Sequence, residues 1–133
     1  MPSPRPHLLR GPHKLVLAHA DDDYRRAALR YLRGLGLDLT AGRSAAEAHY
    51  LARRLDPAVV ILGTTLPDES GYLACAKLKA QHPDCRVILV GRNATAEEAR
   101  FARFVGAQSL VDPQDGLPEL ACHVFGEAVP AAC

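Results

Sequence analysis

The residues that could do chemistry stand within three positions of the end of a short apolar run. Five polar or charged residues share this placement: His19, Asp21, Thr64, Arg92 and Asp112. His19 could sense pH, because histidine titrates near neutrality; a hydrogen bond to a nearby loop is the simpler role, and we favour it. Arg92 could bind an anion, but we expect it to form an internal ion pair with Asp21 or Asp112.

Metal-binding and catalytic patterns are missing from the sequence. The four cysteines match no zinc-binding spacing, and the histidines are scattered. We interpret the cysteines as small buried hydrophobic residues, with an exposed thiol at Cys133. There is also no glycine-rich phosphate loop and no nucleophile beside a base. The sequence therefore predicts neither a metal site nor an enzyme.

Strand-like and helix-like segments alternate along the chain. Apolar or alternating runs predict strands at 15–18, 37–40, 58–62, 86–90 and 109–111. Helical stripes predict helices that start near 21, 44, 71, 95 and 115 and end near 34, 56, 82, 105 and 127. Ser44 with Glu47, and Thr95 with Glu98, have the spacing of capping boxes. Five such units predict a parallel sheet with helices on both faces.

Length and charge limit the function classes. The 133 residues suit one domain, which we place at 14–127 between a proline-rich, flexible arm at 1–13 and a tail at 128–133. The net charge of +1 predicts no strong attraction to nucleic acid or membranes. No signal peptide and no apolar run of about 20 residues is present. We expect a cytoplasmic protein that binds neither membrane nor nucleic acid directly.

Several segments together resemble the response regulator receiver family of two-component signalling. They are RRAALRYLRGLGLDLTAGRSAAEAHYLARRLDPAVVIL, LPDESGYLACAKLKAQHP, RVILVGRNATAEEARFARFVGAQ and LVDP, in that order. The resemblance covers Lys14 to about Glu127. It implies a flavodoxin-like, doubly wound three-layer fold with strand order 2-1-3-4-5. Sites in such sheets lie at the carboxyl ends of the strands, here around His19, Gly63 and Gly91.

The resemblance also implies a phosphorylation site, but the matching positions lack its chemistry. Receivers use a carboxylate nucleophile after the third strand and an acidic pair that holds Mg²⁺ after the first. They use a hydroxyl after the fourth strand and a lysine after the fifth. Alignment places Gly63 at the nucleophile, His19 and Ala20 at the acidic pair, Gly91 at the hydroxyl and Asp112 at the lysine. We therefore expect no phosphoaspartate and no Mg²⁺.

Two alternatives could restore part of this chemistry. A first strand longer by two residues would bring Asp21 and Asp22 to the acidic pair, although Gly63 would remain. Thr64, Thr65 or Asp68 could be substitute acceptors. Because side chains alternate along a strand, we expect the Thr64 hydroxyl to point away from the nucleophile position.

The resulting functional hypothesis is a receiver-like module that acts through protein partners of a bacterial signalling pathway, without phosphorylation. Receivers often pair through helix 4, strand 5 and helix 5. A homodimer on that surface could use Phe101, Phe104 and Phe125, although these residues are also suited to the core. The alternative function is binding of a small molecule in the emptied pocket by His19, Thr64 and Arg92.

Overall fold

The computed structural model describes residues 14–92 and 95–126. Its strands are β1 (Lys14–Ala18), β2 (Asp38–Gly42), β3 (Val59–Gly63), β4 (Arg86–Val90) and β5 (Ser109–Val111). Its helices are α2 (Asp22–Gly34), α3 (Ala45–Leu55), α4 (Gly71–Gln81), α5 (Ala96–Phe104), the 3₁₀ turn η1 (Pro113–Asp115) and α6 (Leu117–Phe125). The predicted arm, the predicted tail and Glu127 lie outside the described residues.

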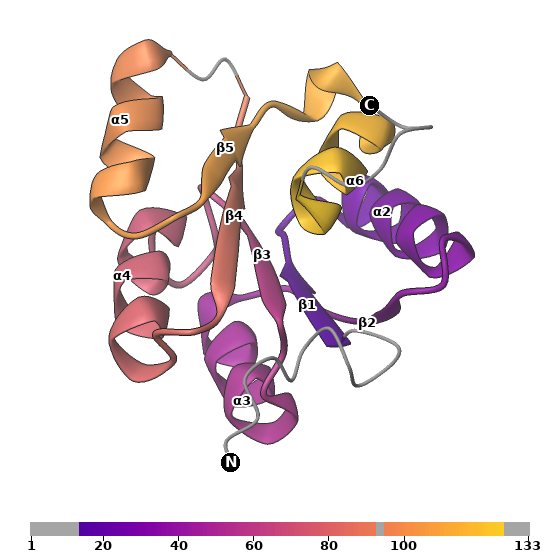
Figure 1. Cartoon of the computed structure of the whole chain (residues 1–133), viewed down its shortest axis with the longest axis horizontal. Helices are drawn as coiled ribbons and strands as arrows, with labels where there is room; N and C mark the ends of the chain where they lie inside the picture. The colour runs from indigo at the N-terminus through magenta and orange to yellow at the C-terminus, as the bar shows by residue number, and fades with distance from the viewer. Residues whose placement is uncertain (1–13, 93–94, 127–133) are drawn as a thin grey trace.

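The strands form one parallel sheet in the order β2-β1-β3-β4-β5. Figure 1 shows α3, α4 and α5 on one side of the sheet and α2 with α6 on the other. The central strand β3 is buried on both faces. Val60 and Leu62 pack with α3, α4 and α5, whereas Val59 and Ile61 pack with α2 and α6. The predicted three-layer flavodoxin-like fold with order 2-1-3-4-5 is therefore confirmed.

The helix starts follow from side chains that satisfy free backbone amides. Asp21 caps α2 and accepts from the amides of Asp23 and Tyr24. Thr95 and Glu98 form the predicted capping box on α5. At α3 the Ser44 side chain caps as predicted, but the Glu47 carboxylate accepts from the Arg43 amide at 2.6 Å, one residue before the cap. That capping box is therefore not reciprocal.

The main difference from the predicted elements is at the last helix. We placed its start at Asp115, but Gly116 adopts φ +92° and separates η1 from α6. A positive φ breaks a right-handed helix, and glycine adopts it readily. β2 and β3 also extend to Gly42 and Gly63. None of the described helices is both long enough and apolar enough to cross a membrane.

Candidate functional site

The carboxyl ends of four neighbouring strands meet at one edge of the sheet. Register pairs Ala18 with Leu62 and Gly63 with Val90. Two backbone hydrogen bonds continue the ladder past the strands: Thr64 N to Val90 O at 2.9 Å, and Gly91 N to Val111 O at 3.0 Å. The predicted site positions His19, Gly63, Gly91 and Asp112 therefore come from adjacent strand ends, at the edge where the α/β fold places its sites.

The imidazole of His19 lies against Gly63. A Cβ atom added to Gly63 would be 3.0 Å from His19 Cδ2 and 3.4 Å from both Cγ and Nε2. Ordinary contacts between carbon atoms are about 3.5–4.0 Å. The ring therefore occupies part of the space that a side chain at the end of β3 would need.

Three interactions hold His19 in this place. The Asp21 amide donates to Nδ1 at 3.0 Å, so Nδ1 is the acceptor nitrogen and the proton of the neutral ring is on Nε2. Arg25 donates to the His19 carbonyl at 2.8 Å, and the Tyr24 ring lies 4.7 Å away between centroids. Burial lowers the pKa of His19, against the attraction of Asp21. The hydrogen bond from the Asp21 amide is the contact with a nearby loop that we expected for His19.

Thr64 covers the second glycine of the site. A Cβ atom on Gly91 would lie 2.6 Å from Thr64 Oγ1 and 2.8 Å from Cγ2. The nearest atoms to a Cβ on Gly63 belong instead to His19. The Thr64 hydroxyl thus faces the end of β4. Each of the two glycines is covered by another side chain: Gly63 by His19, and Gly91 by Thr64.

The aspartates after β1 serve helix α2. β1 ends at Ala18, Ala20 is exposed in the following loop, and Asp21 is the cap of α2. Asp22 lies in the first turn and forms a short ion pair with Arg25. The longer first strand that we considered is therefore not formed. Within the described residues, no group of three His, Cys, Asp or Glu side chains is arranged to hold a metal ion.

Arg92 and Asp112 stand at the ends of β4 and β5. Arg92 is exposed, and the ion pairs between described residues do not include it, so the predicted internal ion pair is wrong. The pKa of Asp21 is lowered mainly by the Tyr24 amide, and Arg92 contributes only a weaker attraction. The Asp112 carboxylate accepts from the Gln114 amide at 2.9 Å and caps η1.

Acidic side chains fix the loop that follows β3. The two oxygens of Asp68 accept from the amides of Ala45 and Ala46, each at 2.9 Å, at the start of α3. Glu69 contacts His49 of α3 at 3.2 Å and Lys77 of α4 at 2.8 Å. Both carboxylates therefore hold neighbouring helices. The Asp68 contacts and the contact between Glu69 and His49 could not be predicted, because no local pattern connects residues 20 or more positions apart.

The same loop needs a glycine at its end. A Cβ atom on Gly71 would lie 2.0 Å from the carbonyl oxygen of Gly63, so another residue would displace the backbone. The Gly71 amide donates to Thr64 O at 2.8 Å and closes the turn. The close approach explains why the Pro-Asp-x-x-Gly pattern of this loop ends in glycine.

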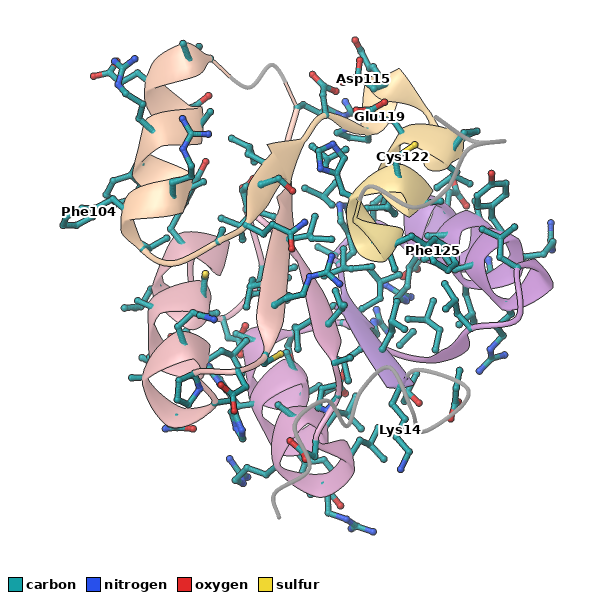
Figure 2. The ribbon with its side chains drawn as sticks, viewed as in Figure 1. Lys14, Phe104, Asp115, Glu119, Cys122 and Phe125 are labelled. Atoms are coloured by element: carbon teal, nitrogen blue, oxygen red, sulfur yellow. The ribbon has the colours of Figure 1, made fainter. Side chains whose placement is uncertain are left out.

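The three phenylalanines of the predicted dimer surface differ in exposure. Phe101 and Phe104 are exposed on α5. Phe125 is half-buried on α6 and packs with the core on the other face of the sheet. Figure 2 shows Phe104 and Phe125 on opposite sides of β5. The homodimer expected on helix 4, strand 5 and helix 5 stays a prediction, in which Phe125 would offer less exposed area than Phe101 and Phe104.

A pocket of about 520 Å³ lies away from the strand ends. It is lined by α2 and the start of α6: Ala27, Arg30, Tyr31, Gly34, Leu35 and Leu117. None of the residues that we expected to bind a small molecule lines it. His19 and Thr64 instead cover the two glycines of the sheet edge, which leaves less room for a ligand there.

Comparison with known proteins gives one family. A family model described as response regulator receiver domain matches residues 16–120. The photosynthetic apparatus regulatory protein RegA of Cereibacter sphaeroides is 26% identical over 102 residues, which are 76% of this chain and 55% of RegA. The chain thus spans about half the length of this curated relative.

Solved receiver structures share the fold. The receiver domain of the Francisella response regulator 1452 has a TM-score of 0.80 at 18% identity, covering 85% of this chain and 93% of that one. The receiver domain of NarL from Mycobacterium tuberculosis has a TM-score of 0.78 at 18% identity, with 91% and 96% covered. The BeF3-activated DrrB receiver domain has a TM-score of 0.77 at 23% identity, with 86% and 95% covered.

Proposed function

The chain belongs to the response regulator receiver domain family, and from this premise we propose that it regulates its partners without accepting a phosphoryl group. One observation carries the proposal: β3 ends in Gly63, and the His19 ring lies against it. Aspartyl phosphorylation requires a carboxylate nucleophile and open space for the incoming phosphoryl group. Gly63 supplies no carboxylate, and His19 takes part of the space.

The other positions of the site support the same proposal. Mg²⁺ would need oxygen ligands after β1, where His19 and Ala20 stand instead. Gly91 offers no hydroxyl. Asp112 carries a negative charge, which repels phosphoryl oxygens, where a lysine would attract them. We therefore propose that the site binds neither Mg²⁺ nor phosphate.

A receiver without this chemistry works through contact. The receiver family is regulatory, and the described residues include no metal-binding group of three side chains. We propose that its ligands are proteins of a bacterial two-component pathway, that it catalyses no reaction, and that it acts in the cytoplasm. The near-neutral net charge of +1 argues against direct binding to nucleic acid.

Incubation with acetyl phosphate and Mg²⁺, followed by intact-mass measurement, tests the proposal. A receiver with an intact aspartate serves as the positive control. We expect no phosphate adduct on this chain, and no rise in Tm with beryllofluoride and Mg²⁺. A hydroxylamine-labile adduct would overturn the proposal. Repeating the reaction with Asp68→Asn would then show whether that carboxylate had become the acceptor.

A further inference from the structure

The pocket beside α2 is open because two small residues line it. Ala27 and Gly34 are seven positions apart on one face of the helix, with Arg30 and Tyr31 between them. A Cβ atom on Gly34 would meet no described atom within 4 Å, so open space lies beside it. The volume of about 520 Å³ falls within the range of small-molecule sites, roughly 300–1,000 Å³.

The apolar part of the lining is anchored in the core. Tyr31 and Leu117 are half-buried and pack against the hydrophobic cluster that α2 and α6 share with the sheet. Leu35, directly after α2, lines the same pocket and is 43% exposed. Side chains that the core fixes before binding lose little conformational entropy when a ligand covers them. The pocket therefore offers fixed apolar surface to an aromatic or aliphatic group.

Arg30 supplies the charge of the pocket. The other three arginines of α2 have partners: Arg25 binds Asp22, Arg26 binds Asp23, and Arg33 donates to the Leu39 carbonyl. Arg30 is exposed, and the ion pairs between described residues do not include it. The described residues that line the pocket include no aspartate or glutamate. A guanidinium in this setting favours an anion, and its planar N–H groups can bind a carboxylate through two parallel hydrogen bonds.

We propose that this pocket binds a small aromatic carboxylate, with the ring on the apolar lining and the carboxylate on Arg30. A cationic ligand would be repelled by the guanidinium, and inorganic phosphate would leave the apolar lining uncovered. The inference goes beyond the proposed function, because the pocket lies away from the strand ends and needs no phosphate chemistry. It also differs from the small-molecule site expected from sequence, which was placed at the strand ends.

Titration of the full chain with 2-naphthoate, followed by two-dimensional ¹H–¹⁵N NMR, tests the site. This probe has two fused aromatic rings and one carboxylate. We expect a dissociation constant on the order of 0.1–1 mM, from the usual binding free energy per ligand atom. The amide signals of Ala27, Tyr31 and Leu117 should shift with the added ligand. No saturable shift, or shifts centred on His19 and Gly63, would overturn the proposal.

The neutral analogue 2-naphthamide separates the effect of charge from that of the ring. It should bind the wild type about tenfold more weakly, because it makes no charge-assisted hydrogen bonds. Arg30→Gln should weaken 2-naphthoate about tenfold and leave 2-naphthamide nearly unchanged. Arg103→Gln is the matched control, because Arg103 is exposed in the last turn of α5, on the other side of the sheet. Equal losses in the two variants would refute the carboxylate contact with Arg30.

Filling the pocket tests its position. Gly34→Leu adds a side chain where a Cβ atom has open space, and leucine suits a helix better than glycine. The variant should therefore keep or raise the Tm of the wild type. It should also weaken both probes by about tenfold or more, because the new side chain takes the space of the ring. Unchanged affinity in a folded Gly34→Leu variant would overturn the proposal.

Failure here is distinct from failure of the proposed function. A phosphate adduct after incubation with acetyl phosphate would refute phosphorylation-independent action and leave the binding of 2-naphthoate intact. A chain that forms no adduct and binds no 2-naphthoate would refute only the pocket.

Discussion

Replacement of Gly63 by alanine tests whether the His19 ring fills the space of the missing side chain. The new Cβ would lie 3.0 Å from His19 Cδ2, so the ring must retreat by about 0.5 Å or more to reach an ordinary contact distance. Retreat would strain the hydrogen bond from the Asp21 amide to Nδ1 and the packing against Tyr24.

The expected magnitude follows from two opposing effects. Inserting a carbon into a filled space costs about 1–3 kcal/mol. Alanine recovers about 0.5–1 kcal/mol relative to glycine within a strand. We therefore expect Gly63→Ala to lower the free energy of unfolding by about 1 kcal/mol. After His19→Ala the space is open, and the same change should stabilise the protein by about 0.5 kcal/mol.

Urea unfolding of the wild type, both single variants and the double variant measures this coupling. The structure predicts an interaction free energy of about 1–3 kcal/mol between positions 19 and 63. Gly34→Ala is the control, since a Cβ there would meet no atom within 4 Å. Additivity within about 0.5 kcal/mol would refute the reasoning, because it would mean that the ring does not limit the space at Gly63.

Three further outcomes follow from the same contacts. Gly91→Ala should lower the free energy of urea unfolding by about 1–3 kcal/mol, and Thr64→Ala should relieve most of that loss; equal losses in both backgrounds would contradict the packing. Asp68→Ala should cost about 1 kcal/mol in the same assay. The amide of Ala45, followed by that of its neighbour, lowers the pKa of Asp68. Its stabilisation is therefore present above the ordinary carboxyl pKa and is lost as the pH falls through the lowered value, and Asp68→Asn should remove this part of the acid dependence. Burial lowers the pKa of His19, so its contribution is present above the ordinary histidine pKa and is lost as the pH falls through the lowered one; an NMR titration midpoint at or above the ordinary value would contradict this.

The order of the elements could be predicted because each central strand has a simple pattern. The runs that became β3 and β4 are apolar on both faces, which in a chain of alternating elements indicates strands between two helical layers. The helix starts at Asp21 and Thr95 could also be predicted, because one side chain there accepts hydrogen bonds from nearby backbone amides. The prediction was wrong at Asp115 because it did not take account of the backbone angle of Gly116.

The contacts that cover the site could not be predicted in the same way. His19 and Gly63 are 44 positions apart, and their distance depends on the packing of β1 against β3. The Arg92 ion pair was predicted from charge alone. Exposed ion pairs gain little free energy in water and must offset the lost freedom of a long side chain, so opposite charges near one another do not ensure a contact.

The site adjoins the core of the molecule. Leu62 and Val90 belong to the two hydrophobic clusters and directly precede Gly63 and Gly91. Each glycine is covered by a polar side chain. His19 covers Gly63 and accepts a hydrogen bond from the Asp21 amide, and Thr64 covers Gly91 at the end of the adjacent strand. Under the proposed function, a carboxylate introduced at position 63 would lie against the His19 ring and would find no Mg²⁺ ligands at positions 19 and 20. The proposal therefore predicts that Gly63→Asp alone does not make the site accept a phosphoryl group, and that a phosphate adduct on this variant would contradict it.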